Sequence, residues 1–170
     1  MVTVPSGEQR AYSLKQISDG QFIMDFVIHG TNGPGSIWAA QAGLGDEILV
    51  SEPPYHCEIP SVSRALFIAD SSALLAAKTL AESVDMDSRI LFVDDHLDRE
   101  QIPVPPNTTY VDSLTDVELT CVTQDLDPDD SFLWAAGERH LAKLVREFAR
   151  ESHLPRTNQH IQTYWILGPQ

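Results

Sequence analysis

The sequence predicts an α/β protein in which a partial antiparallel β-barrel precedes a five-stranded parallel sheet covered by helices. Apolar side chains stand at every second position from Phe22 to Ile28, the pattern of a strand with one buried face. From Arg64 onwards, short apolar runs alternate with helical segments, which is typical of a parallel sheet covered on both faces. Residues 51–60 contain Pro53, Pro54 and Pro60 and indicate a linker between the two portions.

In the first portion, residues 10–17 are the expected partner of a strand over 21–29, with a turn at Ser18-Asp19-Gly20. A short helix is expected to begin near Pro34, because proline is favoured in a first helical turn, and to run to Gly43. Residues 46–50 form the next predicted strand. We assign residues 1–52 to the partial barrel and residues 53–63 to the linker.

The second portion, residues 64–170, alternates strands with helices. The predicted strands cover residues 64–69, 89–93, 108–111, 131–134 and 160–166. Asp70-Ser71-Ser72 is expected to cap a helix that runs to about Ser83. A second helix is predicted over 137–152, with Leu141, Leu144, Val145 and Phe148 along one apolar stripe. Residues 116–124 fit a helix and a strand equally well.

Charge and composition exclude several classes of function. The formal net charge of −14 opposes nonspecific nucleic-acid binding, which needs clustered Lys and Arg. No apolar run is long enough to cross a bilayer and no signal peptide is visible, so we expect a cytoplasmic protein without membrane insertion. The two cysteines and six histidines have no metal-ligand spacing and form no Ser/His/Asp or Cys/His arrangement, which leaves a metal site and nucleophilic catalysis without support.

Two groups of residues point to a dinucleotide ligand. Arg10-Ala11-Tyr12-Ser13 pairs a cation with an aromatic ring, and the turn from His29 to Ser36 opens a helix through Gly30, Gly33 and Gly35. Glycines permit close backbone approach and positive φ, and a helix N-terminus favours a pyrophosphate. Residues 70–72 and 134–138 each follow a parallel strand, at the sheet edge where ligands of open α/β proteins bind.

These segments together resemble the siderophore-interacting protein family, whose members are FAD-dependent ferric-siderophore reductases of the ferredoxin–NADP reductase type. Five motifs occur in the family's order, from Arg10 to Gly168. They are Arg10-Ala11-Tyr12-Ser13, Asp25-Phe26-Val27-Ile28-His29-Gly30, Gly33-Pro34-Gly35-Ser36-Ile37-Trp38-Ala39, Trp134-Ala135-Ala136-Gly137-Glu138 and Tyr164-Trp165-Ile166-Leu167-Gly168. A further segment, residues 69–76, corresponds to the family's G-D-E-T-A-L-P-A.

The resemblance implies a role for each motif. Arg10 would pair with the FAD phosphates, Tyr12 would stack on the isoalloxazine and Ser13 would hydrogen-bond near its N5–O4 edge. The segments around Ser72 and Glu138 would contact NAD(P)H. The implied cofactor-binding residues are Arg10, Tyr12, Ser13, His29, Gly30, Gly33, Pro34, Gly35, Ser36, Asp70, Ser72, Gly137, Glu138 and Trp165.

Each assignment has a structural alternative. Arg10 fits a surface ion pair, Tyr12 a packed strand aromatic, and the glycine turn an ordinary turn. Asp70-Ser71-Ser72 fits a plain helix cap, Glu138 fits the first turn of a helix, and the terminal Tyr-Trp pair and Trp38 fit packing positions.

Two functions therefore stay open. The first is a reductase that passes electrons from NAD(P)H through FAD to the Fe(III) of a siderophore. The second is a shortened, non-catalytic relative with weak or no FAD binding, which would act as a nucleotide-binding or interaction module, or a chain whose true start precedes Met1. Its basis is that the family has further barrel strands before the Arg10 motif. Ser71 also replaces an acidic residue of the family, and Ile166 replaces a basic one. An unclosed barrel would expose strand edges and favour self-association. Asp94 and Asp95 favour NADH, whereas Arg99 keeps NADPH open.

Overall fold

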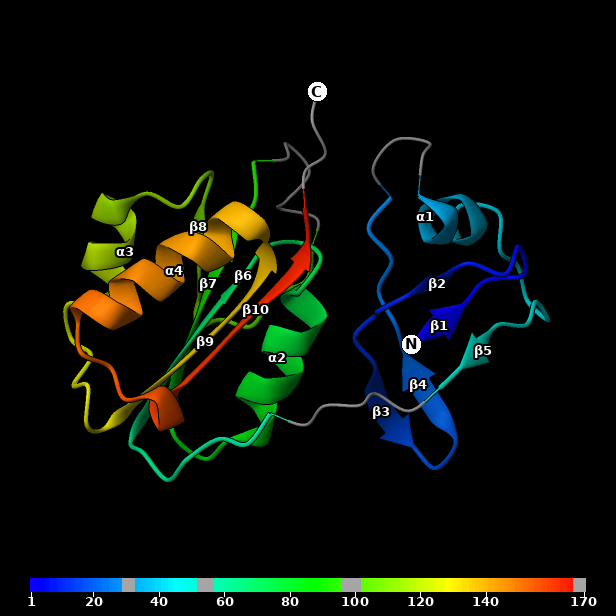
Figure 1. The fold of residues 1–170 in the computed structure, drawn as a ribbon. Helices are drawn as coiled ribbons and strands as arrows, with labels where there is room; N and C mark the ends of the chain where they lie inside the picture. Colours follow the sequence, from blue (N-terminus) through cyan, green and yellow to red (C-terminus); the bar gives the residue numbers. More distant parts are fainter. Residues whose placement is uncertain (29–32, 52–56, 96–101, 167–170) are drawn as a thin grey trace. The chain divides into compact units, whose positions relative to one another are not determined.

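A computed structural model describes residues 1–28, 33–51, 57–95 and 102–166 of the chain (Figure 1). The chain forms two compact units, Met1–His56 and Cys57–Gln170. Small antiparallel sheets make up the first unit and a five-stranded parallel sheet makes up the second, which confirms the predicted fold class.

The first unit contains two small antiparallel sheets and one short helix. β1 (Val2–Thr3) lies between β2 (Gln9–Arg10) and β5 (Leu49–Val50) in a three-stranded sheet. β3 (Lys15–Ser18) and β4 (Gln21–Ile23) form a hairpin, and α1 spans Pro34–Ala39. The predicted turn between β3 and β4 is confirmed, with Gly20 at φ +71°, a conformation that glycine adopts without steric cost.

Strands in this unit are shorter than the sequence predicts. The strand expected over 10–17 is split, because Arg10 belongs to β2 while β3 begins only at Lys15. β4 ends at Ile23, well before the predicted end at residue 29. Further along, Phe26 packs against aromatic rings instead of continuing the ladder. α1 likewise ends at Ala39 instead of Gly43, and the strand expected over 46–50 is reduced to β5.

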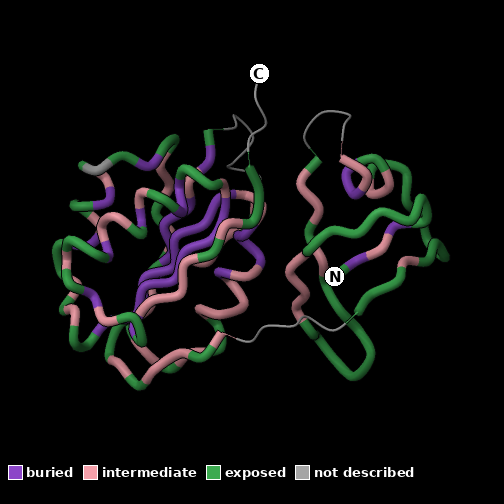
Figure 2. Tube along the Cα trace, viewed as in Figure 1, coloured by how far each residue is buried: buried purple, intermediate pink, exposed green. Residues whose placement is uncertain are grey.

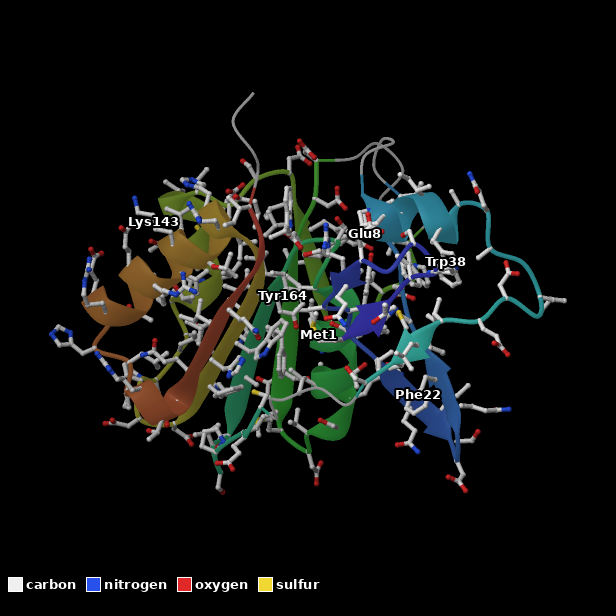
Figure 3. The ribbon with its side chains drawn as sticks, turned by 45° about the vertical axis from the view of Figure 1, so that its right-hand side comes forward. Met1, Glu8, Phe22, Trp38, Lys143 and Tyr164 are labelled. Carbon is white, nitrogen blue, oxygen red and sulfur yellow. The ribbon has the colours of Figure 1, made fainter. Side chains whose placement is uncertain are left out.

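The first unit has a thin core (Figure 2). Among its described residues only Val2, Val4, Gly35 and Ser36 are buried. Several large apolar side chains are exposed on its strands and helix: Ile17, Phe22, Ile23, Ile37, Leu49 and Val50. Figure 3 shows Phe22 projecting from β4, where 54% of its surface is accessible.

The second unit is a parallel sheet with helices on both faces (Figure 1). Its strands run in the order β10-β9-β6-β7-β8 and are all parallel. Their bounds are β6 (Arg64–Ala69), β7 (Asp87–Val93), β8 (Thr108–Val111), β9 (Ser131–Glu138) and β10 (Gln159–Trp165). The helices are α2 (Leu74–Ser83), α3 (Asp116–Thr123) and α4 (Arg139–Glu151).

Alternate side chains of the central strands enter two separate cores. Phe67 of β6 packs with Leu74 of α2 on one face, whereas Leu66 and Ile68 pack with Val145 of α4 on the other. Because both faces are covered, the strands are continuously apolar, as Arg64–Ala69 predicted. The predicted apolar stripe of α4 is confirmed, since Leu141 and Val145 are buried.

Three helix boundaries differ from, or complete, the sequence prediction. α2 begins at Leu74 with Ala73 as its N-cap and no side-chain cap, so Asp70-Ser71-Ser72 precedes the helix without capping it. α4 begins at Arg139, because Gly137 and Glu138 still belong to β9. The ambiguous segment 116–124 is the helix α3, whose start is fixed by a capping box between Thr115 and Glu118.

The strand order creates a switch point between β6 and β9. From β6 the chain proceeds outward through β7 to β8, then returns to the other side of β6 for β9 and β10. The carboxyl ends of β6 and β9 are therefore neighbours, with Ala69 in register with Ala136. In open α/β sheets this is the position at which ligands bind.

Candidate functional site

At the switch point, the Asp70 carboxylate accepts four hydrogen bonds. One oxygen accepts from the backbone N–H of Ser72 at 2.9 Å and from its hydroxyl at 2.5 Å. The other accepts from the backbone N–H of Glu138 at 2.7 Å and from the indole N–H of Trp165 at 2.9 Å. Asp70 is only 9% exposed, so this carboxylate replaces lost water with protein donors.

These contacts join the ends of three strands. Asp70 follows β6, Glu138 ends β9 and Trp165 ends β10, which is displaced by a bulge between Thr163 and Trp165. We call the set Asp70, Ser72, Gly137, Glu138 and Trp165 the carboxylate junction. The sequence predicts a cofactor contact for all five members, with Trp165 beside the flavin and the others near NAD(P)H. Although 95 positions separate Asp70 from Trp165 in the sequence, the fold brings them together.

Gly137 is required by this arrangement for two reasons. Its φ is +151°, a conformation that side-chain-bearing residues rarely adopt. A Cβ at this position would lie 2.5 Å from an Asp70 carboxylate oxygen and 2.6 Å from the carboxyl carbon. The glycine thus permits the Asp70 side chain to approach the backbone of β9. The sequence prediction attributed Gly137 to the close approach of a dinucleotide, whereas the structure shows a packing reason.

Trp165 is the aromatic side chain of the carboxylate junction, and Tyr164 precedes it on β10. Trp165 is 40% exposed and Tyr164 is 37% exposed. The Glu138 carboxylate accepts from the backbone N–H of His140 and caps α4, which is the structural alternative considered for this residue. The edge therefore presents a fixed indole ring held by a buried carboxylate, a geometry suited to positioning a planar group rather than to proton transfer.

In the first unit, the aromatic rings of Tyr12, Phe26 and Trp38 pack one against the next. The Tyr12 and Phe26 ring centroids are 4.5 Å apart, and those of Phe26 and Trp38 are 5.5 Å apart. Burial raises the pKa of the Tyr12 hydroxyl, and the nearby charge of Arg10 acts in the opposite direction. Trp38 packs against Phe26, which agrees with the packing role given above as its alternative. Tyr12 packs against the same ring, as expected for a packed strand aromatic.

Polar groups around α1 include donors that a phosphate could use. Gly33 is the N-cap at φ −96°, so it needs no special conformation, and Pro34 opens the helix. The Ser36 hydroxyl donates to the Val27 carbonyl at 2.7 Å and is committed to the fold. The first-turn N–H groups of Gly35 and Ser36 precede the first intrahelical bond, which runs from Ile37 to Gly33.

Gly35 has a packing reason of its own. A Cβ there would lie 1.7 Å from the Tyr12 hydroxyl oxygen, so this glycine makes room for the tyrosine. Ser13 is half-buried, and exposed Arg10 donates one hydrogen bond to the Gln9 carbonyl at 2.7 Å. His29 and Gly30, also expected at the cofactor, lie outside the described residues, as does Arg99.

Two further surveys cover the described part of the chain. No cluster of three or more His, Cys, Asp or Glu side chains there could hold a metal ion. Within the same residues, no helix is both long enough and apolar enough to span a bilayer.

Asp94, which directly follows β7, is buried, and its backbone N–H donates to the Val111 carbonyl at 3.0 Å.

Comparison with known proteins identifies relatives for both units. The sequence profile of siderophore-interacting proteins matches residues 62–168, and that of the siderophore-interacting FAD-binding domain matches residues 5–57. The mycobactin import ATP-binding/permease protein IrtA of Mycobacterium tuberculosis is 28% identical over 173 residues, and that of Mycolicibacterium smegmatis is 26% identical over 172. Each alignment covers 94% of this chain, which spans only about 20% of either relative.

Solved structures share the fold. The siderophore-interacting protein SipS from Aeromonas hydrophila matches with a TM-score of 0.76 at 20% identity, over 97% of this chain and 77% of SipS. A ferredoxin NADP+ reductase from Neisseria gonorrhoeae, solved with FAD and NADP, matches with a TM-score of 0.57 at 12% identity. That alignment covers 91% of this chain and 85% of the reductase, so the architecture predicted from the motif order is confirmed.

Proposed function

Because the chain belongs to the siderophore-interacting protein family, we propose that it is a flavin-dependent reductase of ferric siderophores that takes its electrons from NAD(P)H. The observation that carries the proposal is the carboxylate junction, which gathers residues from three strand ends at the switch point of the sheet. A fixed aromatic ring at this edge suits the stacking of a planar cofactor. Since NAD(P)H is a cytosolic reductant, we also propose a cytoplasmic location.

The first unit offers donors that fit a dinucleotide phosphate. Arg10 is exposed and its guanidinium has donors beyond the one used by Gln9, so it can form a bidentate pair with an oxyanion. The N–H groups of Gly35 and Ser36 would hold the pyrophosphate. Tyr12 and Ser13 would lie along the ring system, on the side of Tyr12 not covered by Phe26.

In the second unit, we infer that Asp70 acts indirectly. All four of its hydrogen bonds go to protein donors, so Asp70 would position Trp165 and the Glu138 backbone instead of binding the nucleotide itself. FAD, if bound, would supply the redox chemistry, which is uptake of an electron pair from NAD(P)H and single-electron transfer to Fe(III). This chain's residues would bind, orient and shield the reactants, and no protein acid or base is needed.

The experiment that tests this proposal has two stages. Purified protein is incubated with excess FAD, desalted, and examined for retained flavin absorbance. The loaded protein is then mixed with NADH or NADPH and a ferric siderophore, and Fe(II) is captured by a colorimetric chelator. Protein that stays colourless would refute flavin binding, and retained flavin without Fe(II) formation would refute the reductase.

A charge-matched pair of variants tests the phosphate role of Arg10. Arg10→Gln should weaken FAD binding by about tenfold or more, because a hydrogen bond to a charged group contributes about 1.5–3 kcal/mol. Lys15→Gln removes the same charge from β3 of the same unit and should leave FAD affinity within about twofold. Equal losses in both variants would indicate a general charge effect instead of a phosphate contact.

A non-catalytic relative is the second candidate, and one observation favours it. The open edges of the small sheets carry exposed Phe22, Ile23 and Leu49, an arrangement that favours pairing with another chain. This candidate predicts self-association together with little FAD binding. Sedimentation analysis alongside the desalting assay separates the two, because a monomer with near-stoichiometric flavin excludes the second candidate.

A further inference from the structure

A cavity of about 620 Å3 lies at the amino-terminal end of β10, whereas the carboxylate junction lies at the carboxyl end of the same strand. It is bordered by the second half of α4, the 3-10 turn Arg156–Asn158 and the start of β10. Gln159 begins β10 at the cavity, whereas Trp165 ends the same strand at the junction. Six residue steps at about 3.3 Å each separate the two places by roughly 20 Å.

The cavity concentrates positive charge in an acidic protein. The chain has 11 Lys and Arg against 25 Asp and Glu, giving a net charge of −14. Three of those cations and a histidine nevertheless line this one cavity, and no Asp or Glu is among its lining residues. We call it the arginine pocket; it is lined by Arg146, Ala149, Arg150, His153, Leu154, Arg156 and Gln159.

Its cations have little compensation from acidic side chains. Arg146 donates to the Ile161 carbonyl at 3.2 Å and to the Thr163 hydroxyl at 3.4 Å, which fixes its guanidinium without neutralising it. Arg150 approaches Glu151 at 3.9 Å, but both side chains are about three-quarters exposed, so the pair is weak. For Arg156, no ion pair occurs among the described parts of the chain.

The spacing of these cations opposes a purely structural role. Arg146 and Arg150 are four residues apart on α4, and like charges at that spacing destabilise a helix. The helix dipole explains a cation in the last turn, where Arg150 lies. It does not explain Arg146, one turn earlier, or Arg156, beyond the end of the helix.

The chain reversal after α4 also retains a side chain where glycine is usual. The backbone N–H groups of His153 and Leu154 donate to the carbonyls of Arg150 and Ala149, the pattern of a Schellman motif. His153 occupies its left-handed position at φ +56°, the one non-glycine residue with positive φ among those described. Glycine would fit this backbone with less strain, so the imidazole at the pocket is retained against a conformational cost.

From these features we propose that the arginine pocket binds an organic polyanion, a small molecule with at least two phosphate or carboxylate groups. Guanidinium groups bind such oxyanions through paired hydrogen bonds. The cavity volume falls within the range of small-molecule sites and far exceeds the size of a single inorganic ion. Leu154, which is 8% exposed, adds a small apolar surface beside the arginines. None of its lining residues is among the proposed flavin and nucleotide contacts, and the proposal does not rest on them.

Titration calorimetry of the full chain with pyrophosphate, citrate and ATP, at constant ionic strength, tests the proposal. Saturable binding of at least one probe is expected, and the preference between pyrophosphate and citrate identifies the favoured group. Arg150→Gln combined with Arg156→Gln should weaken that binding at least tenfold. The matched control, Lys143→Gln with Arg89→Gln, removes the same charge from exposed pairs outside the pocket and should change affinity less than twofold.

Four results would overturn the proposal. These are absence of saturable binding, equal losses in the two double variants, loss of probe binding on saturation with FAD, and binding to phosphatidylglycerol vesicles without binding to any soluble probe. Competition by FAD would assign the probe to the cofactor site instead. Circular dichroism of both double variants checks that the fold is intact, which is expected because the replaced arginines and lysine are exposed.

Discussion

Replacing Asp70 by alanine should destabilise the second unit by about 3 kcal/mol. The substitution removes an acceptor of four hydrogen bonds, two of which come from part-buried backbone N–H groups that would lose this partner. Hydrogen bonds to a charged group contribute about 1.5–3 kcal/mol each, for a gross loss of roughly 6 kcal/mol or more. Removing the carboxylate also ends its desolvation penalty of several kcal/mol, which leaves the smaller net value.

Asparagine at the same position should cost only about 1 kcal/mol. Its amide oxygen can accept from Glu138 and Trp165, and its NH2 group can face the Ser72 hydroxyl, which is able to accept. Only the Ser72 backbone N–H then loses its partner. The order wild type, Asp70→Asn, Asp70→Ala is therefore a direct consequence of the junction geometry.

Urea unfolding followed by circular dichroism measures the free energy of unfolding. Asp85→Ala is the matched control, because Asp85 is exposed, carries the same charge and has no contact with the junction. The reasoning is refuted if Asp70→Ala lies within about 0.5 kcal/mol of Asp85→Ala, the usual range of surface substitutions. It is refuted equally if the asparagine and alanine variants are equally unstable.

Two other predictions follow from buried groups. Ser131→Ala should leave the free energy of unfolding in urea unchanged or raise it by up to about 1 kcal/mol, because the buried Ser131 hydroxyl has no partner among the described residues. Thr123→Val removes a 2.6 Å hydrogen bond to the Leu119 carbonyl and should lower the free energy of unfolding by about 1 kcal/mol. Burial raises the pKa of the Cys57 thiol from its ordinary 9.0 to about 11, so at about pH 8 iodoacetamide should label exposed Cys121 well before Cys57, as read by mass spectrometry. Since the folded pKa is the higher one, this thiol should also favour unfolding as the pH rises from about 9 to about 11, and equal labelling rates would contradict its burial.

The second unit could be predicted well from sequence because its signals are local. Arg64–Ala69 is a strand with the predicted bounds, since an almost continuous apolar run suits a sheet buried on both faces. Thr108–Val111 also has the predicted bounds, although this edge strand is more polar and only partly buried. The first unit was predicted less well, because strands as short as Val2–Thr3 contain too few residues to show a period. Its aromatic packing also depends on contacts of Phe26 with Tyr12 and with Trp38 that no local pattern records.

For the candidate site, sequence inspection found the right residues of the junction but assigned them a different role. The strand ends indicated that Asp70 and Gly137 share one edge, whereas the resemblance assigned Trp165 to the flavin pocket. Side-chain direction is set by tertiary packing, so the inward turn of the Asp70 carboxylate was not predictable. The arginine pocket was missed altogether, although Arg146 and Arg150 lie four residues apart on α4, shortly before His153, and could have indicated it.

The difference in core size between the first unit and the second has a consequence for how long the protein persists in a cell. The first unit has few buried residues among those described and therefore gains little folding free energy from its own interior. A ligand that binds this unit adds its binding free energy almost directly to the free energy of local unfolding. Proteases should consequently trim the empty protein back to its α/β half while sparing the loaded form. The supply of ligand, more than the rate of synthesis, would then set how much intact chain accumulates.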